Sequence, residues 1–134
     1  MVFSVYGIGW TIDPNKVFKN VSEVLKPKGR FVWSWEHPSY TQVKLDTDKV
    51  VVGSSYYEED FVFHKDWGGN GMHMSVRKIS TWFNMLVSNG FMVERILEPK
   101  PLKFSENQLE SSSYYSKAKA DMVPPTIIFD CVKL

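Results

Sequence analysis

The chain has 134 residues, of which 43% are hydrophobic and 15% aromatic, and its formal net charge is +1. These values fit one folded domain with its own core and exclude a disordered chain, and the absence of any Lys/Arg run longer than two residues argues against a nucleic-acid-binding face. No apolar run approaches the roughly 18 residues of a membrane span, no signal-peptide pattern opens the chain, and the single Cys131 excludes internal disulfides, so we expect a cytoplasmic protein.

The first elements predicted along the chain are a strand, a helix and a second strand. Residues 2–6 form an apolar run typical of a strand. Asp13 and Pro14 mark a helix start, because Asp caps free amides and Pro suits the first helical position. Apolar residues then recur at helical spacing: Val17, Phe18, Val21, Val24 and Leu25. Gly29 ends this helix and residues 30–35 form the next strand, so the two strands should lie parallel in one sheet.

An irregular insertion, residues 39–74, comes after the second strand. Within it we expect a hairpin over residues 43–52, an extended piece over residues 56–63 and a flexible turn over residues 67–71. The segment is too long for an ordinary connection, and such insertions commonly carry function or cover a site.

Regular elements return after the insertion. Ser75 is the expected cap of a helix that Gly90 ends. The apolar face of this helix consists of Val76, Ile79, Phe83, Leu86 and Val87. Residues 91–97 then form a strand, Ser105 opens a short polar helix with a capping-box pattern, and residues 126–132 form the last strand.

Six stretches of the chain match, in order and spacing, the second half of a known enzyme family. They are residues 2–7 (VFSVYG), 25–32 (LKPKGRFV), 34–38 (SWEHP), 77–84 (RKISTWFN), 89–91 (NGF) and 98–101 (EPKP). Together they resemble class I S-adenosylmethionine-dependent methyltransferases of the small-molecule type, over nearly the whole chain except residues 39–66. Lys28 stands where the family commonly has Gly, and Val76 stands where relatives often carry His, so a histidine-based role is absent there.

The resemblance implies that residues 1–134 are the C-terminal half of a methyltransferase domain. The fold class is then α/β: a partial Rossmann-like methyltransferase fold with a mostly parallel sheet, an antiparallel last strand and a small β-rich insertion. The four sheet strands of this chain would lie in the order first, second, fourth, third.

The family's cofactor is S-adenosylmethionine, held by a Gly-rich turn after the family's first strand and by an acidic residue that ends its second. This chain has no such turn in that place, since Gly7 and Gly9 come after the family's fourth strand instead. We therefore expect the chain to bind the cofactor weakly or not at all, and to be inactive alone.

Candidate site residues lie at the carboxyl ends of the parallel strands, where open α/β sheets bind ligands. Ser4, Val5 and Tyr6 end the first strand, and the resemblance implies that they contact the cofactor. The alternative is that Val5 and Tyr6 belong to the sheet core.

Glu36 and His37 end the second strand and are the candidate catalytic residues, because an imidazole can move a proton near neutral pH. For His37 we favour the alternative of a histidine bonded to a neighbouring loop. Glu36 could instead pair with Arg77 or face solvent.

Four aromatic residues are candidates to bind the methyl acceptor, since acceptor pockets are mostly apolar: Trp10, Trp35, Tyr56 and Trp67. The more common role of such residues is plain core. His64 and His73 lack a third ligand at a recognisable spacing, so no metal is predicted. Cys131 lies in a strand, where a buried thiol is expected rather than a reactive one.

Two functions of different classes remain open. The first is a methyltransferase whose acceptor side, for a small molecule, lies in this chain. The second is a non-enzymatic α/β module that binds a small apolar ligand or a partner subunit. An upstream reading frame that encodes a strand and a Gly-rich turn would favour the first. In the full methyltransferase fold residues 2–6 would pair with a strand that this chain lacks, so here they should form an apolar sheet edge. This predicts a homodimer or another association through that edge or through exposed apolar helix faces.

Overall fold

The computed structural model describes residues 1–47, 49–64, 72–102 and 116–134, with side chains described except for residues 60–64, 72 and 73. Its elements are β1 (Val2–Val5), η1 (Ile8–Trp10), α1 (Pro14–Val24), β2 (Arg30–Glu36), α2 (Pro38–Gln42), β3 (Val43–Asp46), β4 (Lys49–Val52), β5 (Asp60–His64), β6 (Met72–Val76), α3 (Ile79–Ser88), β7 (Phe91–Leu97), α4 (Lys117–Met122) and β8 (Thr126–Lys133). Within these ranges, no helix has both the length and the apolar character needed to cross a bilayer.

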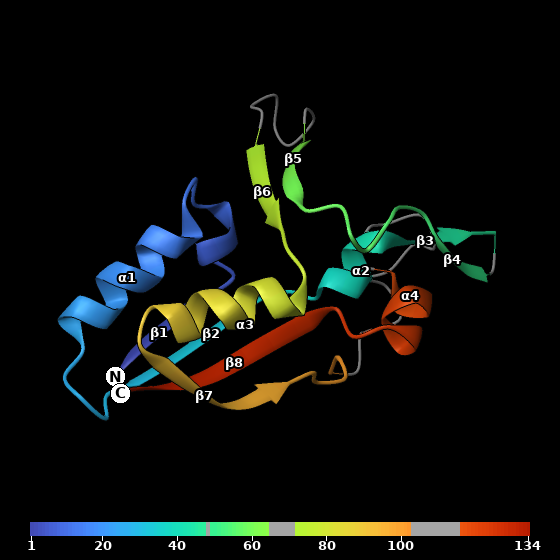
Figure 1. Ribbon diagram of the computed structural model, residues 1–134. Helices are drawn as coiled ribbons and strands as arrows, with labels where there is room; N and C mark the ends of the chain where they lie inside the picture. Colours follow the sequence, from blue (N-terminus) through green and yellow to red (C-terminus); the bar gives the residue numbers. More distant parts are fainter. Residues whose placement is uncertain (48, 65–71, 103–115) are drawn as a thin grey trace.

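Four strands form the main sheet in the order β1-β2-β8-β7. β1 and β2 pair in parallel, and β8 is antiparallel to both of its neighbours, β2 and β7. β1, β2 and β7 therefore point the same way and end at the same edge of the sheet (Figure 1). The predicted fold class, strand order and antiparallel last strand are confirmed.

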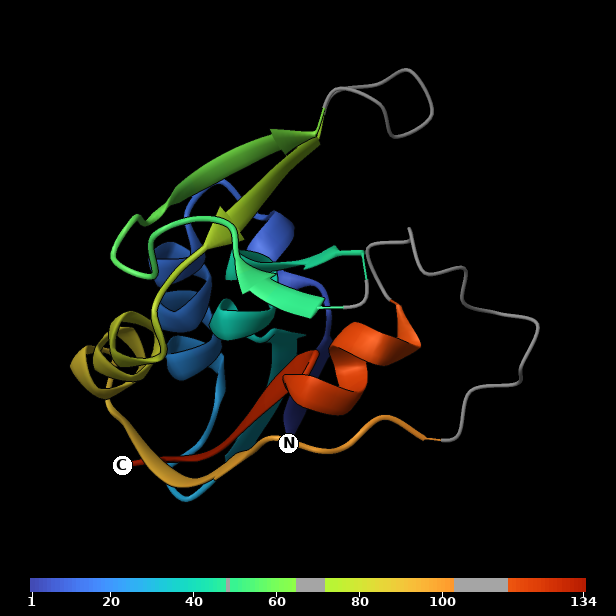
Figure 2. The same ribbon diagram turned by 90° about the vertical axis from the view of Figure 1, so that its right-hand side faces the viewer.

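The helices α1 and α3 cover one face of this sheet (Figures 1 and 2). α1 begins where the sequence predicts, because Oδ1 of Asp13 accepts a hydrogen bond from the backbone N–H of Lys16 at 3.0 Å and Pro14 occupies the first turn. α3 ends before Gly90, whose φ of 80° is the left-handed conformation that glycine adopts without strain.

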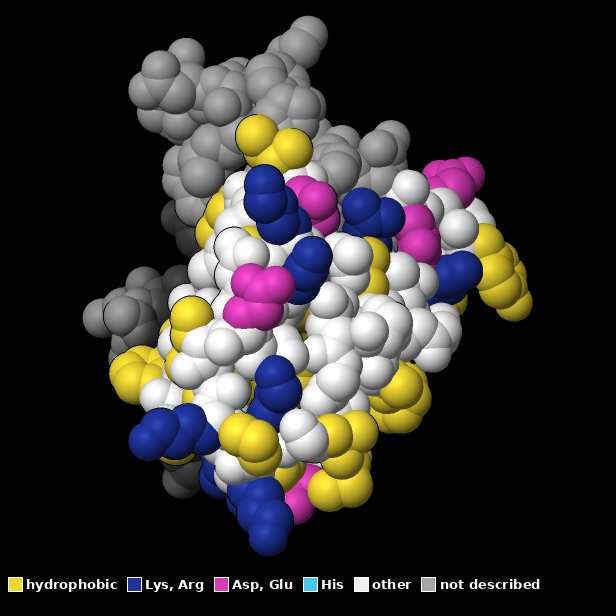
Figure 3. Space-filling view, turned by 60° about the vertical axis from the view of Figure 1, so that its left-hand side comes forward, with side chains coloured by type: hydrophobic (Ala, Val, Ile, Leu, Met, Phe, Trp, Pro, Cys, Tyr) yellow, Lys and Arg dark blue, Asp and Glu magenta, His cyan; other side chains and the backbone are white. Residues whose placement is uncertain are grey.

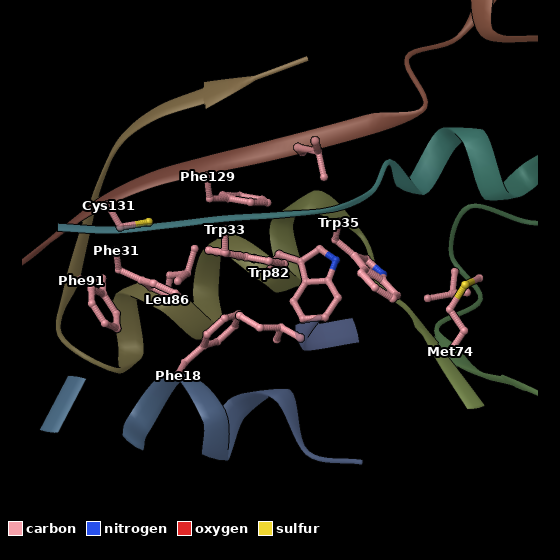
Figure 4. Close-up of a cluster of buried hydrophobic side chains, with 13 residues drawn as sticks. Phe18, Phe31, Trp33, Trp35, Met74, Trp82, Leu86, Phe91, Phe129 and Cys131 are labelled. Carbon is pink, nitrogen blue, oxygen red and sulfur yellow. The ribbon is translucent and has the colours of Figure 1, made fainter. Parts of the chain in front are cut away.

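The core between the helices and the sheet is mainly aromatic (Figure 4). Phe18 of α1 and Trp82 of α3 are fully buried and both contact Trp33 of β2. On the neighbouring strand, Phe129 stacks on Trp33 with ring centroids 4.9 Å apart and planes 7° apart. Offset and edge-to-face ring contacts of this kind add stability beyond the burial of apolar area.

The opposite face of the sheet is less covered by the described elements. Alternation along β1 directs Phe3 and Val5 to this face, where they are 71% and 72% exposed. The same face carries an ion pair, in which the guanidinium of Arg30 donates to both carboxylate oxygens of Asp130 at 2.6 Å. On the side of the molecule shown in Figure 3, charges of both signs are interspersed and hydrophobic side chains occur in several separate places.

The insertion consists of two hairpins and a short helix. The predicted hairpin over residues 43–52 is confirmed, since β3 and β4 pair with Val43 opposite Val52. A second hairpin, β5–β6, contains part of the predicted extended piece and packs on η1 through β6 (Figure 2). The flexible turn predicted over residues 67–71 and the polar helix predicted at Ser105 lie outside the described residues.

The predicted start of the second long helix at Ser75 is wrong. Ser75 and Val76 belong to β6, and α3 begins four residues later, at Ile79. The apolar residues Val76 and Ile79 suit a helical face equally well, but pairing with β5 and the burial of Met74 and Val76 hold residues 72–76 in a strand.

Candidate functional site

A cavity of about 430 Å³ lies at the edge where β1, β2 and β7 end. Its walls come from the segments just beyond these three strands, from α4 and from the start of β8. The lining residues are Tyr6, Tyr40, Pro99, Lys100, Pro101, Leu102, Ala120, Pro125 and Thr126. Cavities of this size and mostly apolar lining are typical of small-molecule sites, and carboxyl strand ends are where open α/β sheets place them.

Tyr6 joins two walls of the cavity. Its hydroxyl lies 2.5 Å from Oγ1 of Thr126, so the end of β1 is tied to the start of β8. Tyr6 has a φ of 50°, a left-handed conformation that is uncommon outside glycine and often found at functional sites. Burial raises the pKa of the Tyr6 hydroxyl and the nearby Glu36 charge adds to this, whereas the hydrogen bond with Thr126 acts in the opposite direction.

Glu36, Tyr40 and Lys119 form a buried group of ionisable side chains beside the cavity, and Tyr40 belongs to its lining. Glu36 and Lys119 are 4% and 3% exposed, and Tyr40 is fully buried. The ammonium of Lys119 lies 3.9 Å from the centroid of the Tyr40 ring, a cation–π contact that joins α4 to α2.

Burial and nearby charges shift the pKa values of Tyr40 and Lys119. Burial raises the pKa of Tyr40 to about 12, and the negative charges of Glu36 and Tyr6 contribute. Burial lowers the pKa of Lys119, and Glu36 opposes that shift. Tyr40 therefore keeps its proton at neutral pH. Because Glu36 is buried, the alternative in which it faces solvent is wrong.

His37 caps the short helix α2, and both of its ring nitrogens have partners. Nδ1 accepts a hydrogen bond from the backbone N–H of Ser39 at 3.1 Å, and Nε2 lies 2.7 Å from Oε1 of Glu98. With Nδ1 accepting, the proton of a neutral ring is on Nε2 and is directed at Glu98. This geometry supports the loop-bonded role of His37, which the sequence already favoured over the catalytic one.

Trp35 lies behind the site as part of the core. It is 1% exposed, and its indole N–H donates to the carbonyl of Ser75 at 3.0 Å. The ring of Trp10 meets it edge-on, with centroids 5.2 Å apart, and Tyr6 lies against it at 5.9 Å. Trp35 and Trp10 therefore support the residues around the cavity rather than line it.

The other predicted site residues are dispersed. Ser4 is partly buried on the helix-covered face of β1, whereas Val5 lies on the opposite face and is exposed. The hydroxyl of Tyr56 accepts a hydrogen bond from the backbone N–H of Ile79 at the start of α3, away from the cavity. Trp67 lies outside the described residues. Among the described His, Cys, Asp and Glu residues, no three gather as a metal site.

Sequence reasoning missed Tyr40, Lys100, Lys119 and Thr126. A signal existed for two of them, because Lys100 comes soon after the third sheet strand and Thr126 opens the fourth, at the ligand-binding edge. For Lys119 there was none, since a lysine in a short helix is expected to be exposed.

The glycines after β1 do not form an open cradle for a cofactor. A Cβ on Gly9 would lie 1.8 Å from Cε2 of Trp35, and one on Gly7 would lie 2.9 Å from Oγ of Ser4. The space beside both glycines is therefore filled by this chain's own side chains. The described residues do not fit the Gly-rich turn by which the family holds S-adenosylmethionine.

No protein-family model matches the sequence, and no curated protein matches it. Solved structures do match its fold. An S-adenosylmethionine-dependent methyltransferase from Listeria monocytogenes has a TM-score of 0.76 at 20% identity, covering 99% of this chain and 60% of that one. Another from Mesorhizobium loti has a TM-score of 0.71 at 23% identity, covering 98% and 60%.

A third match is the glycopeptide N-methyltransferase MtfA, solved in complex with S-adenosyl-L-homocysteine. It has a TM-score of 0.57 at 13% identity and covers 99% of this chain and 54% of that one. These similarities show a class I methyltransferase-like fold. The chain spans about 60% of the length of the first two structures.

Proposed function

We propose that this chain, which has a class I methyltransferase-like fold, forms the acceptor side of an S-adenosylmethionine-dependent methyltransferase that acts on a small molecule. The observation that carries the proposal is the cavity at the carboxyl edge of the sheet, lined by Tyr6, Tyr40 and Thr126. Because the cavity is mostly apolar, its contribution is to bind and orient the acceptor and to exclude water from it.

S-adenosylmethionine, when bound to an enzyme of this class, supplies an activated methyl group. Trp35 and Ser4 fill the space beside Gly9 and Gly7, respectively. We therefore propose that the donor is held by residues outside this chain. The chain alone is then expected to bind S-adenosylmethionine weakly or not at all and to be inactive. The predicted roles of Ser4, Val5 and Tyr6 toward the cofactor, and of Glu36 and His37 in catalysis, stay predictions, as does the cytoplasmic location.

The cavity also supports a second candidate, a non-enzymatic module that binds a small apolar ligand. Every described wall of the cavity comes from this chain, so a ligand could bind without a donor. The two candidates share the binding step and differ in the next one, since only the methyltransferase transfers a methyl group.

We propose association through the free edge of β1 as well. β1 pairs with β2 on one side, and none of the described strands pairs with its other side. A strand edge with exposed Phe3 and Val5 is a template for pairing with another chain, either a second copy or a chain that carries the donor site.

The test compares the chain alone with the chain translated together with any in-frame upstream sequence that encodes a strand and a Gly-rich turn. Calorimetric titration with S-adenosylhomocysteine measures cofactor binding, and transfer of a labelled methyl group to small aromatic acceptors measures activity. We expect both only in the longer protein. Micromolar binding by the chain alone would contradict the proposed division of the site. Saturable binding of a small aromatic ligand by the chain, with neither cofactor binding nor methyl transfer in the longer protein, would favour the second candidate.

A further inference from the structure

We propose that the cavity binds a small planar aromatic molecule that carries one hydroxyl group and one carboxylate. This inference rests on the proposed function in naming the molecule as the methyl acceptor, but the binding itself does not depend on methyl transfer. Three features of the lining carry it: flat apolar walls, a pair of hydroxyl groups, and one lysine.

The walls favour a flat apolar ligand. The lining includes Tyr6 and Tyr40 and three prolines, Pro99, Pro101 and Pro125. Rigid rings in an apolar lining favour contact with the flat face of an aromatic ligand. The rings are held in place, because Lys119 lies against Tyr40 and Thr126 is bonded to Tyr6.

The hydroxyl pair favours a ligand that exchanges a hydrogen bond. A hydroxyl group has one proton to donate and two lone pairs to accept with. Tyr6 and Thr126 share one hydrogen bond, so whichever oxygen accepts in it still has its own proton to donate. A phenolic hydroxyl of the ligand can accept that proton and donate its own to a remaining lone pair. A purely apolar ligand would cover that remaining proton and offer it no acceptor, which is unfavourable.

The lysine favours an anionic group at the other end of the ligand. Lys100 lines the cavity, is exposed, and makes no ion pair with any described residue. The carboxylates near the cavity are engaged elsewhere, since Glu98 is bonded to His37 and Glu36 is buried beside the positive charge of Lys119. Lys100 is therefore the charged group best placed to attract a ligand carboxylate.

The test is a calorimetric titration of the chain with three probes: 4-hydroxybenzoate, benzoate without the hydroxyl, and phenol without the carboxylate. We expect 4-hydroxybenzoate to bind most tightly. Tyr6→Phe should remove the preference over benzoate, and Lys100→Gln should remove the preference over phenol, each with a loss of roughly three- to tenfold in affinity for 4-hydroxybenzoate. Thr126→Val removes the other hydroxyl of the pair and serves as a second test of its role.

The matched controls are Tyr57→Phe, at an exposed tyrosine, and Lys26→Gln, at an exposed lysine before β2. Circular dichroism checks that each variant is folded. The proposal is overturned if 4-hydroxybenzoate does not bind the wild-type chain saturably, or if Tyr6→Phe and Lys100→Gln bind it as the controls do. Binding with the expected preferences, but no methyl transfer in the longer protein, would overturn the proposed function and leave the ligand site intact.

Discussion

Gly9 packs against the indole ring of Trp35, so closely that a Cβ at this position would be 1.8 Å from Cε2 and 2.0 Å from Cζ2 of that ring. Trp35 in turn holds the carbonyl of Ser75 through its indole N–H. The pair therefore joins η1, β2 and β6 behind the cavity. A rigid, fully buried indole cannot move aside as a surface side chain can.

Gly9→Ala should destabilise the fold by about 1 to 3 kcal/mol, the usual cost of an overpacked core position. Urea unfolding monitored by tryptophan fluorescence measures it. Gly53→Ala is the matched control, because the three atoms nearest to its Cβ would all belong to the flexible side chain of Lys44. Equal stability of the two variants would mean that Gly9 and Trp35 do not lie as described.

The main sheet was predictable from the sequence, whereas the cavity was not. Local signals, such as the cap at Asp13 and the glycine at Gly90, mark the ends of the helices between the strands, and the strand order was implied by the family resemblance. The cavity depends on positions 6, 40, 100 and 126, which only the tertiary fold brings together. The helices α2 and α4 have five and six residues, too few for a periodic pattern, and depend on contacts such as Lys119 with Tyr40.

The buried hydroxyl of Tyr40 should make stability fall as the pH rises above 10. Its folded-state pKa of about 12 exceeds the ordinary value of 10, so between these values the unfolded chain loses a proton that the folded chain keeps. The stabilisation is complete below pH 10 and is lost as the pH approaches 12, by at most about 2 to 3 kcal/mol for this group. The raised pKa values of Tyr6 and Cys131 act with the same sign.

Urea unfolding at several pH values between 8 and 11.5 measures this loss. Tyr40→Phe should flatten the slope, and Tyr57→Phe, at an exposed tyrosine, should leave it unchanged. If Tyr40→Phe has the slope of the wild-type chain, Tyr40 ionises as freely in the folded state as in the unfolded one.

The thiol of Cys131 should be unreactive in the folded protein. It is fully buried, and burial raises its pKa to about 12, so almost no thiolate is present near neutral pH. Ellman's reagent at pH 8 should react only as fast as the protein unfolds, and at once in 8 M urea. Stoichiometric reaction of the native protein within the mixing time would contradict the burial of the Cys131 thiol.

His37→Asn and His37→Ala separate the two roles considered for this residue. As a helix cap, His37 should be replaced fairly well by Asn, which can also accept from the N–H of Ser39, while Ala should cost about 1 to 2 kcal/mol. In an upstream-extended protein that transfers methyl groups, as proposed above, His37→Asn should then keep most of the methyl-transfer rate. A rate loss of roughly a hundredfold or more with stability retained would instead identify His37 as a catalytic base.

The free edge of β1 should control self-association. Phe3 is exposed beside this edge, and a lysine there places a charge where another strand would pack. Phe3→Lys should raise the dissociation constant measured by sedimentation velocity by roughly tenfold or more, since edge lysines are a common protection against strand pairing. Ile12→Lys is the matched control, because Ile12 is exposed in the loop before α1 and lies off the sheet. A wild-type chain that stays monomeric at high concentration would exclude self-pairing, and the edge would then be left for a different chain. If Ile12→Lys weakens association as much as Phe3→Lys does, the effect comes from net charge and not from the edge.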